Sequence, residues 1–209
     1  MTDPRTRLVG EGYDVIADRF VEWRDRIVGD PRAWWREALA SRLADGARLL
    51  ELGCGAGVGD TQLLAERFSV TGVDISHEQI GRARANVPNA VFIQADFTSL
   101  ELEAASFDAV AAFYSFNHVP RDLLGDVFGR IHSWLVPGGH FLVSLAISDT
   151  GAWTGDWLGT TMFFSSFPPE TNRRLLDEAG FERLLDELVT LVEPEPDGEG
   201  VWQWVLCSR

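Results

Sequence analysis

The stretch from Leu49 to Gly57 constrains the fold of this chain more than any other part of it. The apolar run Leu49-Leu50-Glu51-Leu52 leads directly into Gly53-Cys54-Gly55-Ala56-Gly57. Such a run is typical of a buried strand, and glycines suit a turn where the backbone comes close to a ligand. Residues 58–67 are predicted to form a helix. The sequence therefore predicts a strand–loop–helix unit, the place where open α/β sheets bind nucleotide-like ligands.

The spacing of the glycines narrows the choice of ligand. A dinucleotide fingerprint requires G-x-G-x-x-G, but Val58 stands where its third glycine should be. A phosphate-cradling P-loop is excluded because no Lys-Ser/Thr pair follows the turn. No basic residue lies near the turn to meet a phosphate. A nicotinamide-dependent oxidoreductase is therefore a disfavoured alternative.

Two acidic residues follow predicted strands further along the chain. Asp74 ends the strand predicted over 68–74, at the distance from the loop where a carboxylate meets a ribose diol in nucleotide-binding units. Asp96 follows the strand predicted over 90–95. Ser76 and Gln79 form a capping-box pattern for the next helix. The alternative is that Asp74 and Asp96 are ordinary strand-end or turn residues.

The ordered set of elements over residues 47–146 resembles the class I S-adenosylmethionine-dependent methyltransferases. It includes the apolar strand predicted over 107–113 and the turn Leu135-Val136-Pro137-Gly138-Gly139 into a fifth strand. The start of a helix at Tyr13-Asp14 resembles the small bacterial enzymes of the ubiquinone/menaquinone-biosynthesis kind. The resemblance implies an α/β, Rossmann-like, doubly wound sheet of seven mostly parallel strands, with an antiparallel last strand and an N-terminal helical arm.

The resemblance also implies S-adenosyl-L-methionine as the cofactor and assigns residues to it. The loop would wrap the methionine part, Asp74 the ribose, and Asp96 the adenine amino group, with Ile75 and Phe97 against the ring. Phe97 could equally be a core residue, and Tyr13 a core or surface residue. The residues expected at the cofactor are Tyr13, Glu51, Gly53, Cys54, Gly55, Gly57, Asp74, Ile75, Asp96, Phe97 and Phe113.

His118 is the candidate catalytic base. It follows the fourth strand, at the carboxyl edge where ligands bind, and an unperturbed imidazole titrates near neutral pH. The alternative is a histidine that caps or bridges the helix beginning at Pro120. No metal is expected.

The aromatic segment 148–169 shows no clear period, and a connection of this length is usually functional. It is expected to wall an apolar or aromatic acceptor pocket, or else to cover the edge of the sheet. The residues expected at the acceptor are Tyr114, Asn117, Trp153, Trp157, Phe163 and Phe164.

The chain is expected to form one domain. Residues 1–46 would be the helical arm, 47–147 the cofactor-binding core, and 148–209 a substrate lid followed by a helix and a hairpin. Residues 1–10 are expected to be mobile, with a helix from Tyr13 and a second one from Asp30-Pro31 to Gly46. Strands at 181–192 and 200–207 would be joined by a turn at 194–200.

Composition bears on partners and location. The 209 residues carry a net charge of -14 with no basic stripe, which disfavours a nucleic acid substrate. The two cysteines do not suggest a disulfide framework. No apolar run of transmembrane length is present, so a soluble, cytoplasmic protein without membrane partners is expected. A monomer and a homodimer remain open.

The function that these patterns favour is transfer of a methyl group to a small-molecule acceptor. The sulfonium already activates the methyl group, so the protein's main tasks would be positioning and exclusion of water. The alternative from another class is a non-catalytic partner subunit that binds the same cofactor.

Overall fold

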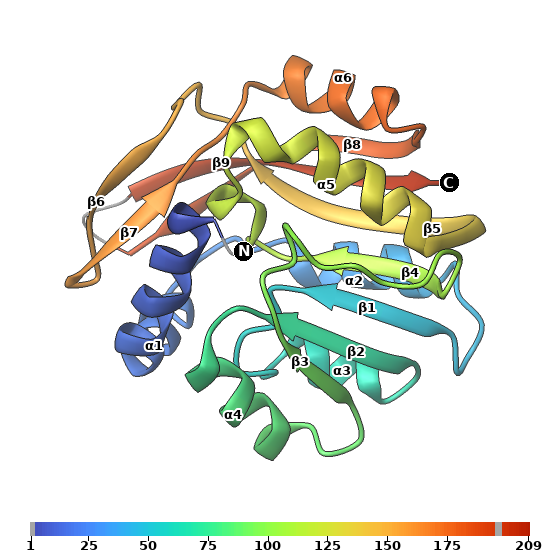
Figure 1. The fold of residues 1–209 in the computed structure, drawn as a ribbon, viewed down its shortest axis with the longest axis horizontal. Helices are drawn as coiled ribbons and strands as arrows, with labels where there is room; N and C mark the ends of the chain where they lie inside the picture. The colour runs from blue at the N-terminus through green and yellow to red at the C-terminus, as the bar shows by residue number, and fades with distance from the viewer. Residues whose placement is uncertain (1–2, 195–197) are drawn as a thin grey trace.

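The computed structural model describes residues 3–194 and 198–209 and is built on one seven-stranded sheet (Figure 1). The strand order is β3-β2-β1-β4-β5-β9-β8. The bounds are β1 Arg48–Leu52, β2 Ser69–Asp74, β3 Val91–Gln94, β4 Phe107–Ala112, β5 Leu135–Ala146, β8 Glu182–Glu193 and β9 Gly198–Ser208.

The direction of the strands confirms the predicted fold class. β3, β2, β1, β4 and β5 pair in parallel, whereas β9 is antiparallel to both β5 and β8. The chain builds outward from β1 to β3 and then returns to place β4 on the other side of β1. This reversal of order opens a crevice at the carboxyl ends of β1 and β4, where α/β sheets bind ligands.

Helices cover both faces of the sheet. The helices α2 (Arg32–Ala40), α3 (Asp60–Ala65) and α4 (His77–Asn86) pack on one face, where Trp35, Leu64 and Ile80 join a single core cluster. The helices α5 (Arg121–Trp134) and α6 (Pro169–Glu178) cover the other face with side chains such as Trp134 and Leu176. The near-continuous apolar strands are therefore buried from both sides, as parallel strands require.

The first helix, α1 (Pro4–Arg24), is longer at its start than predicted. Residues 4–10 are helical, so the expectation of a mobile start is wrong for them. Asp3 caps the helix by accepting a hydrogen bond from the backbone N–H of Arg5 at 2.8 Å, and Pro4 occupies the first turn, where a missing N–H costs nothing. Figure 1 shows α1 lying across the edge where β1 and β2 end.

The second helix ends at Ala40 and not at Gly46 as predicted. Beyond it, the backbone N–H groups of Arg42 and Leu43 bond to carbonyls three residues back, which closes the helix with a tight final turn. The N–H of Gly46 then bonds to the carbonyl of Arg67 at 2.7 Å, which draws the chain toward β1.

The aromatic segment after β5 contains regular structure that its sequence did not reveal. The strands β6 (Trp153–Trp157) and β7 (Thr160–Phe164) form a separate antiparallel hairpin. Leu158 and Gly159 join them with φ values of 51° and 78°, the two positive values that a tight two-residue hairpin turn needs. The predicted C-terminal hairpin is present as β8 and β9, but residues 195–197 of its predicted turn lie outside the described residues.

Candidate active site

A cavity of about 470 Å³ lies at the carboxyl edge of the parallel strands. The glycine loop after β1, the ends of β2, β3 and β4, the inner side of α1 and the β6–β7 hairpin surround it. The predicted site residues that line it are Tyr13, Glu51, Gly53, Cys54, Gly55, Asp74, Ile75, Asp96, Phe97, Phe113, Tyr114, Asn117, His118, Trp153, Trp157 and Phe164. Strand ends far apart in the sequence therefore meet at one space.

Gly53 makes the tight turn of the loop possible. Its φ is 77°, and a Cβ there would lie 2.4 Å from the Cβ of Ser115. The backbone N–H groups of Gly53 and Cys54 both bond to the carbonyl of Val73, at 2.7 and 3.1 Å. Burial raises the pKa of the Cys54 thiol well above its ordinary value, so Cys54 is a small packing residue and not a nucleophile.

Two predicted site residues do not line the cavity. Gly57 has a φ of 74°, and a Cβ there would lie 3.1 Å from Val87 and 3.3 Å from Ala83, so this glycine allows α4 to approach the loop. Phe163 is 3% exposed and packs with Val9 and Ile16 of α1. Side chains alternate along a strand, and β7 thus turns Phe164 toward the cavity and Phe163 into the contact with α1.

Two buried acids stand at the loop. Asp74 accepts hydrogen bonds from the backbone N–H groups of Gly55 at 2.8 Å and Ser76 at 2.9 Å, while burial raises its pKa to about 6. Burial also raises the pKa of Glu51 to about 8. The Oε2 atom of Glu51 has no hydrogen-bond partner among the described residues. Such a buried acceptor is available to a ligand that brings a donor.

Asp96 is held between its own turn and α1. Its Oδ1 accepts from the N–H and hydroxyl of Thr98 at 2.9 and 2.7 Å, and its Oδ2 from the Thr6 hydroxyl at 2.6 Å. Phe97 lines the cavity while its ring stacks on Phe116 with centroids 5.4 Å apart. A role for Phe97 in packing and one in ligand contact are therefore compatible.

His118 lies in the 3-10 turn η1 (Phe116–His118) after β4. Its Nδ1 lies 2.8 Å from the carbonyl oxygen of Phe163, and its Nε2 lies 3.0 Å from the Tyr13 hydroxyl. A carbonyl only accepts, so Nδ1 carries the proton and Tyr13 donates to the lone pair of Nε2. Burial lowers the pKa of His118 to about 4, which keeps the ring neutral at pH 7. The histidine thus bridges η1 to β7 and to α1.

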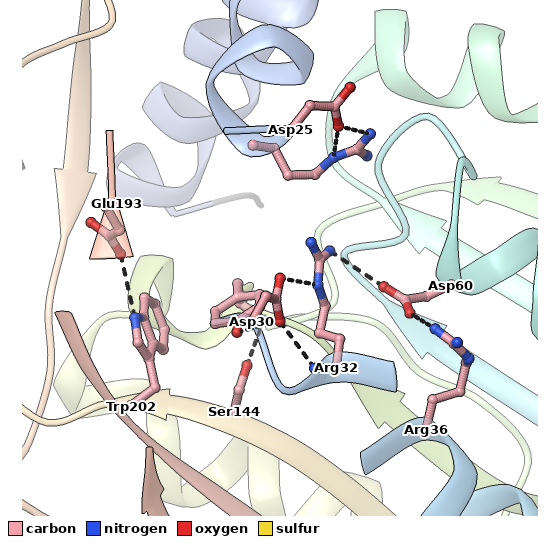
Figure 2. Close-up of polar contacts among 10 residues, drawn as sticks. Asp25, Asp30, Arg32, Arg36, Asp60, Ser144, Glu193 and Trp202 are labelled. Carbon is pink, nitrogen blue, oxygen red and sulfur yellow. Dashed lines mark hydrogen bonds and ion pairs between the residues drawn. The ribbon is translucent and has the colours of Figure 1, made fainter. Parts of the chain in front are cut away.

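A charged cluster that sequence reasoning missed borders the cavity beside the loop (Figure 2). Arg32 donates to Asp30 at 2.6 Å and to Asp60 at 3.3 Å, and Asp60 also accepts from Arg36. The sequence pattern at Asp30-Pro31 predicts only a helix start. No local pattern could have revealed the cluster, because Asp60 lies on α3 and meets Arg32 only in the fold.

Tyr114 belongs to the same corner. Its hydroxyl donates to Asp30 at 2.9 Å, and the guanidinium of Arg32 lies over its ring, 5.3 Å from the centroid. Its φ is 57°, a left-handed value that is strained for a tyrosine. Ser144 fixes this backbone by accepting from the Tyr114 N–H at 2.6 Å. Strain of this kind concentrates at functional sites.

An aromatic wall from α1 and the β6–β7 hairpin lines part of the cavity. The Tyr13 ring meets Phe20 and Trp157 at centroid distances of 5.2 and 6.2 Å, and Trp157 meets Phe164 at 5.5 Å. Among these rings Asn117 presents an Oδ1 atom that has no partner in the described part of the chain. The wall is apolar, with a few polar atoms, as small-molecule pockets are.

Comparisons with known proteins identify the family. A family model described as a methyltransferase domain matches residues 22–186. The chain belongs to this methyltransferase family. An uncharacterized methyltransferase of Synechocystis sp. is 29% identical over 147 residues, which cover 66% of this chain and 68% of that protein. The 27-O-demethylrifamycin SV methyltransferase of Amycolatopsis mediterranei is 34% identical over 57% of this chain, which spans about half of that relative (52%).

Solved structures share the fold of this methyltransferase. The structure of a DhpI–S-adenosylhomocysteine complex superposes with a TM-score of 0.75 and 21% identity, covering 99% of this chain and 98% of that one. A 1,6-didemethyltoxoflavin-N1-methyltransferase of Burkholderia thailandensis, with its substrate and S-adenosylhomocysteine bound, gives a TM-score of 0.67 at 22% identity, covering 100% and 91%. The predicted family, enzyme class and S-adenosylmethionine cofactor are confirmed.

The groups that line the cavity of this methyltransferase match the hydrogen-bonding groups of this cofactor. Gly55 lines the cavity without a Cβ, and a Cβ there would stand in open space, with only the Oε1 atom of Gln79 within 4 Å. The Oε2 atom of Glu51 offers an acceptor that is unpaired among the described residues. Asp74 and Asp96 keep free lone pairs, since a carboxylate has about four acceptor positions.

Among the described residues, none of the helices combines the length and the apolar composition that a membrane-spanning segment requires.

Proposed function

We propose that this methyltransferase methylates a small apolar or aromatic acceptor held against the wall formed by Tyr13, Phe20, Trp157 and Phe164. The observation that supports the proposal is that one cavity joins this wall to the acidic strand ends and the glycine loop. A methyl donor on one side and an acceptor on the other would share a space closed by α1. Such closure excludes water and orients the reactants.

The cofactor half of the proposal assigns a partner to each polar part of S-adenosylmethionine. Asp74 accepts from the ribose hydroxyls and Asp96 from the adenine amino group, with Ile75 and Phe97 beside the ring. Glu51 accepts from the α-ammonium group through its unpaired Oε2, and Arg32 donates to the α-carboxylate. These assignments give the α-ammonium and the α-carboxylate each a side chain of opposite charge.

The bound sulfonium supplies a methyl group that is already activated. For a hydroxyl or amine acceptor, the protein must in addition remove a proton. Tyr13 and His118 suit this task together because Nε2 is the unprotonated nitrogen of the His118 ring, and the Tyr13 hydroxyl already donates to it. The acceptor proton passes to Tyr13 as the Tyr13 proton moves to Nε2, which leaves the acceptor electron pair free for the new bond.

The decisive experiment measures S-adenosylhomocysteine production by mass spectrometry with a panel of hydroxylated and amino-substituted aromatic compounds. We expect turnover with at least one of them, and turnover about 100-fold slower in His118→Ala. His140→Ala, at a residue on β5 outside the cavity lining, is the matched control and should keep full activity. Binding of S-adenosylmethionine without product from any compound would favour the non-catalytic alternative, and undiminished turnover in His118→Ala would remove that residue from the reaction.

A further inference from the structure

Asn117 occupies the middle of the turn η1, which joins the end of β1 to the β6–β7 hairpin. On the side of β1, the hydroxyl of Ser115 donates to the carbonyl of Leu52 at 2.8 Å. On the side of the hairpin, the carbonyl of Asn117 accepts from the N–H of Ser165 at 2.8 Å. Asn117 therefore lies where the glycine-loop half of the cavity meets the half formed by the aromatic wall.

The side chain of Asn117 is not satisfied by the protein. Its neighbours in the turn point elsewhere, because Phe116 stacks on Phe128 with centroids 5.6 Å apart and His118 bonds to Tyr13. With about three residues per turn, Asn117 takes the remaining direction, and it belongs to the cavity lining. Its Oδ1 is buried and has no hydrogen-bond partner among the described residues. An unpaired buried acceptor beside a binding cavity indicates a donor on the ligand.

The hydroxyl groups at the base of the hairpin line the same half of the cavity and have already given their protons to the protein. Ser165 donates to the carbonyl of Val119. Ser166 donates to the carbonyl of Ser148, so the Ser148 hydroxyl is the donor in the 2.7 Å contact between the two hydroxyls. Thr150 in turn donates to the Ser148 hydroxyl at 3.2 Å. Each of these hydroxyls can offer a ligand a lone pair but no proton.

Tyr13 extends this pattern to the position proposed for the reaction. Its only hydroxyl proton lies in the hydrogen bond to Nε2 of His118 at 3.0 Å, so its oxygen meets a ligand as an acceptor. Because His118 and Asn117 are consecutive in the turn, the Tyr13 oxygen and the Asn117 amide serve one small region of the cavity. An acceptor molecule with a single hydroxyl would use its one proton at Tyr13 and leave Asn117 unpaired.

We propose that the methyl acceptor is an aromatic compound with two neighbouring hydrogen-bond donors and that Oδ1 of Asn117 accepts from the second one. The second donor is either a hydroxyl or amine on the adjacent ring carbon, or the second N–H of a primary aromatic amine. The inference rests on the proposed function, because it takes the reacting group to meet Tyr13. It makes Asn117 a specificity-determining residue and disfavours acceptors that bring lone pairs alone, such as carboxylates.

Naphthalene derivatives that differ only in their donors test the proposal. The compounds 2,3-dihydroxynaphthalene and 2-aminonaphthalene carry two N–H or O–H donors each, 2-naphthol and N-methyl-2-aminonaphthalene carry one each, and 2-naphthoate carries none. The measurement is kcat/KM for S-adenosylhomocysteine formation by mass spectrometry. The wild type should prefer a two-donor compound to its one-donor counterpart by about 10-fold, because the counterpart leaves a buried acceptor unpaired. It should not methylate 2-naphthoate, and methylation of that compound as fast as 2-naphthol would overturn the proposal.

Asn117→Leu separates the role of the amide from the intrinsic reactivity of the compounds, which is the same in both proteins. The variant keeps the size of the side chain and should reduce the preference at least threefold. A reduction for the dihydroxy pair assigns the contact to the adjacent hydroxyl, and one for the amine pair assigns it to the second N–H. An unchanged preference in both pairs overturns the proposal.

Two further variants complete the comparison. Asn117→Asp keeps the acceptor oxygen and removes the N–H donors, so it should retain the preference, whereas a loss as large as in Asn117→Leu would show that the amide donates and would overturn the proposal. Asn89→Leu is the matched control, because Asn89 is exposed, bonds to the carbonyl of Ala65 and lies outside the cavity lining. Its preference should equal that of the wild type.

The outcome also separates this inference from the proposed function. Methylation of these compounds with the same preference in the wild type and in Asn117→Leu would retain the aromatic acceptor and overturn only the role of Asn117. For a compound that binds without turnover, calorimetry on the S-adenosylhomocysteine complex gives the same comparison as dissociation constants. A wild type that neither methylates nor binds any of the compounds would contradict the aromatic acceptor and this inference together.

Discussion

At the scale of residues, two acidic side chains at the site, Asp74 and Glu51, are almost completely shielded from water. Asp74 and Glu51 are 9% and 3% exposed, and burial raises the pKa of each. Burial of an acid without a cationic partner is costly, so these side chains are not there to stabilise the apoprotein. In the proposed function, they meet the donors and the positive charge that the cofactor brings.

Asp74→Ala should weaken cofactor binding by about 1–3 kcal/mol through the loss of charge-assisted hydrogen bonds. Asp74→Asn should lose less than the alanine variant, because an amide oxygen can still accept from Gly55 or Ser76. Titration calorimetry with S-adenosylhomocysteine measures both. Asp45→Ala is the control, since Asp45 has an 83% exposed side chain far from the loop. An unchanged dissociation constant in Asp74→Ala would contradict the ribose role.

Cofactor binding near pH 7 should release protons, and Glu51 should supply most of them. Its pKa of about 8 means that the free protein holds it largely protonated at pH 7. A cationic ammonium group beside it favours the ionised form and lowers its pKa, so the proton leaves. Calorimetry with S-adenosylmethionine in phosphate and in Tris should give different heats, and Glu51→Gln should reduce the difference. Equal heats for the wild type in both buffers would contradict the role of Glu51.

The raised pKa of Glu51 also makes the free energy of unfolding depend on pH. The folded-state pKa of Glu51 lies above its ordinary value of 4.5, so the native protein binds more protons than the unfolded chain between about pH 4.5 and 8. The free energy of unfolding contributed by this group therefore falls as pH rises through that window. The bound cation opposes this loss.

At the scale of elements, the glycine loop that follows β1 packs closely against Ser115, the residue before η1. Gly53 and Gly46 have nearly equal φ values, 77° and 79°, but differ in surroundings. A Cβ at Gly53 would overlap Ser115, whereas a Cβ at Gly46 would meet nothing within 4 Å. The pair separates the cost of a left-handed backbone from the cost of lost space.

Gly53→Ala should lower the free energy of unfolding by about 1–3 kcal/mol more than Gly46→Ala, because it adds an overlap to the same backbone strain. Chemical denaturation measures both values. Gly53→Ala should also weaken S-adenosylhomocysteine binding, whereas Gly46→Ala should not. Equal losses of stability in the two variants would show that conformation alone, and not the contact with Ser115, requires glycine at position 53.

The helix α1 joins the separate strand ends into one rim. Thr6 bonds to Asp96 after β3, Asp14 accepts from the Ser76 hydroxyl at 2.6 Å after β2, and Tyr13 bonds to His118 after β4. Each of these contacts crosses more than 60 residues of sequence. The helix therefore holds together the segments that follow three different strands.

At the scale of the whole molecule, the cavity lies between three parts of the chain: the N-terminal helix, the sheet and the β6–β7 hairpin. A ligand in it contacts all three, so binding should stabilise the fold as a unit. A ligand at 100 times its dissociation constant adds about 2.7 kcal/mol, which raises the melting temperature of a chain of this size by roughly 5–10 °C.

Thermal unfolding with saturating S-adenosylhomocysteine should therefore show this rise in one transition. NAD at the same concentration is the control and should cause no shift, because Val58 breaks the dinucleotide fingerprint. A comparable rise in melting temperature with NAD would contradict the prediction that the loop does not bind a dinucleotide. A rise confined to part of the molecule, seen as two transitions, would contradict the coupling of the three parts.

The sequence by itself determined the sheet and the edge of the sheet at which the cavity lies. Apolar runs that end in Glu51, Asp74 and Asp96 have a local cause, because buried parallel strands need continuous apolar residues and end where the chain leaves the core. The tertiary structure alone decided the Arg32–Asp60 pair, the Tyr13–His118 contact and the direction of Phe163. It also decided that the N–H of Ser76 bonds to Asp74 and not, as the predicted capping box requires, to the Gln79 side chain. Each of these depends on a partner from another element, and local sequence does not record distances between elements.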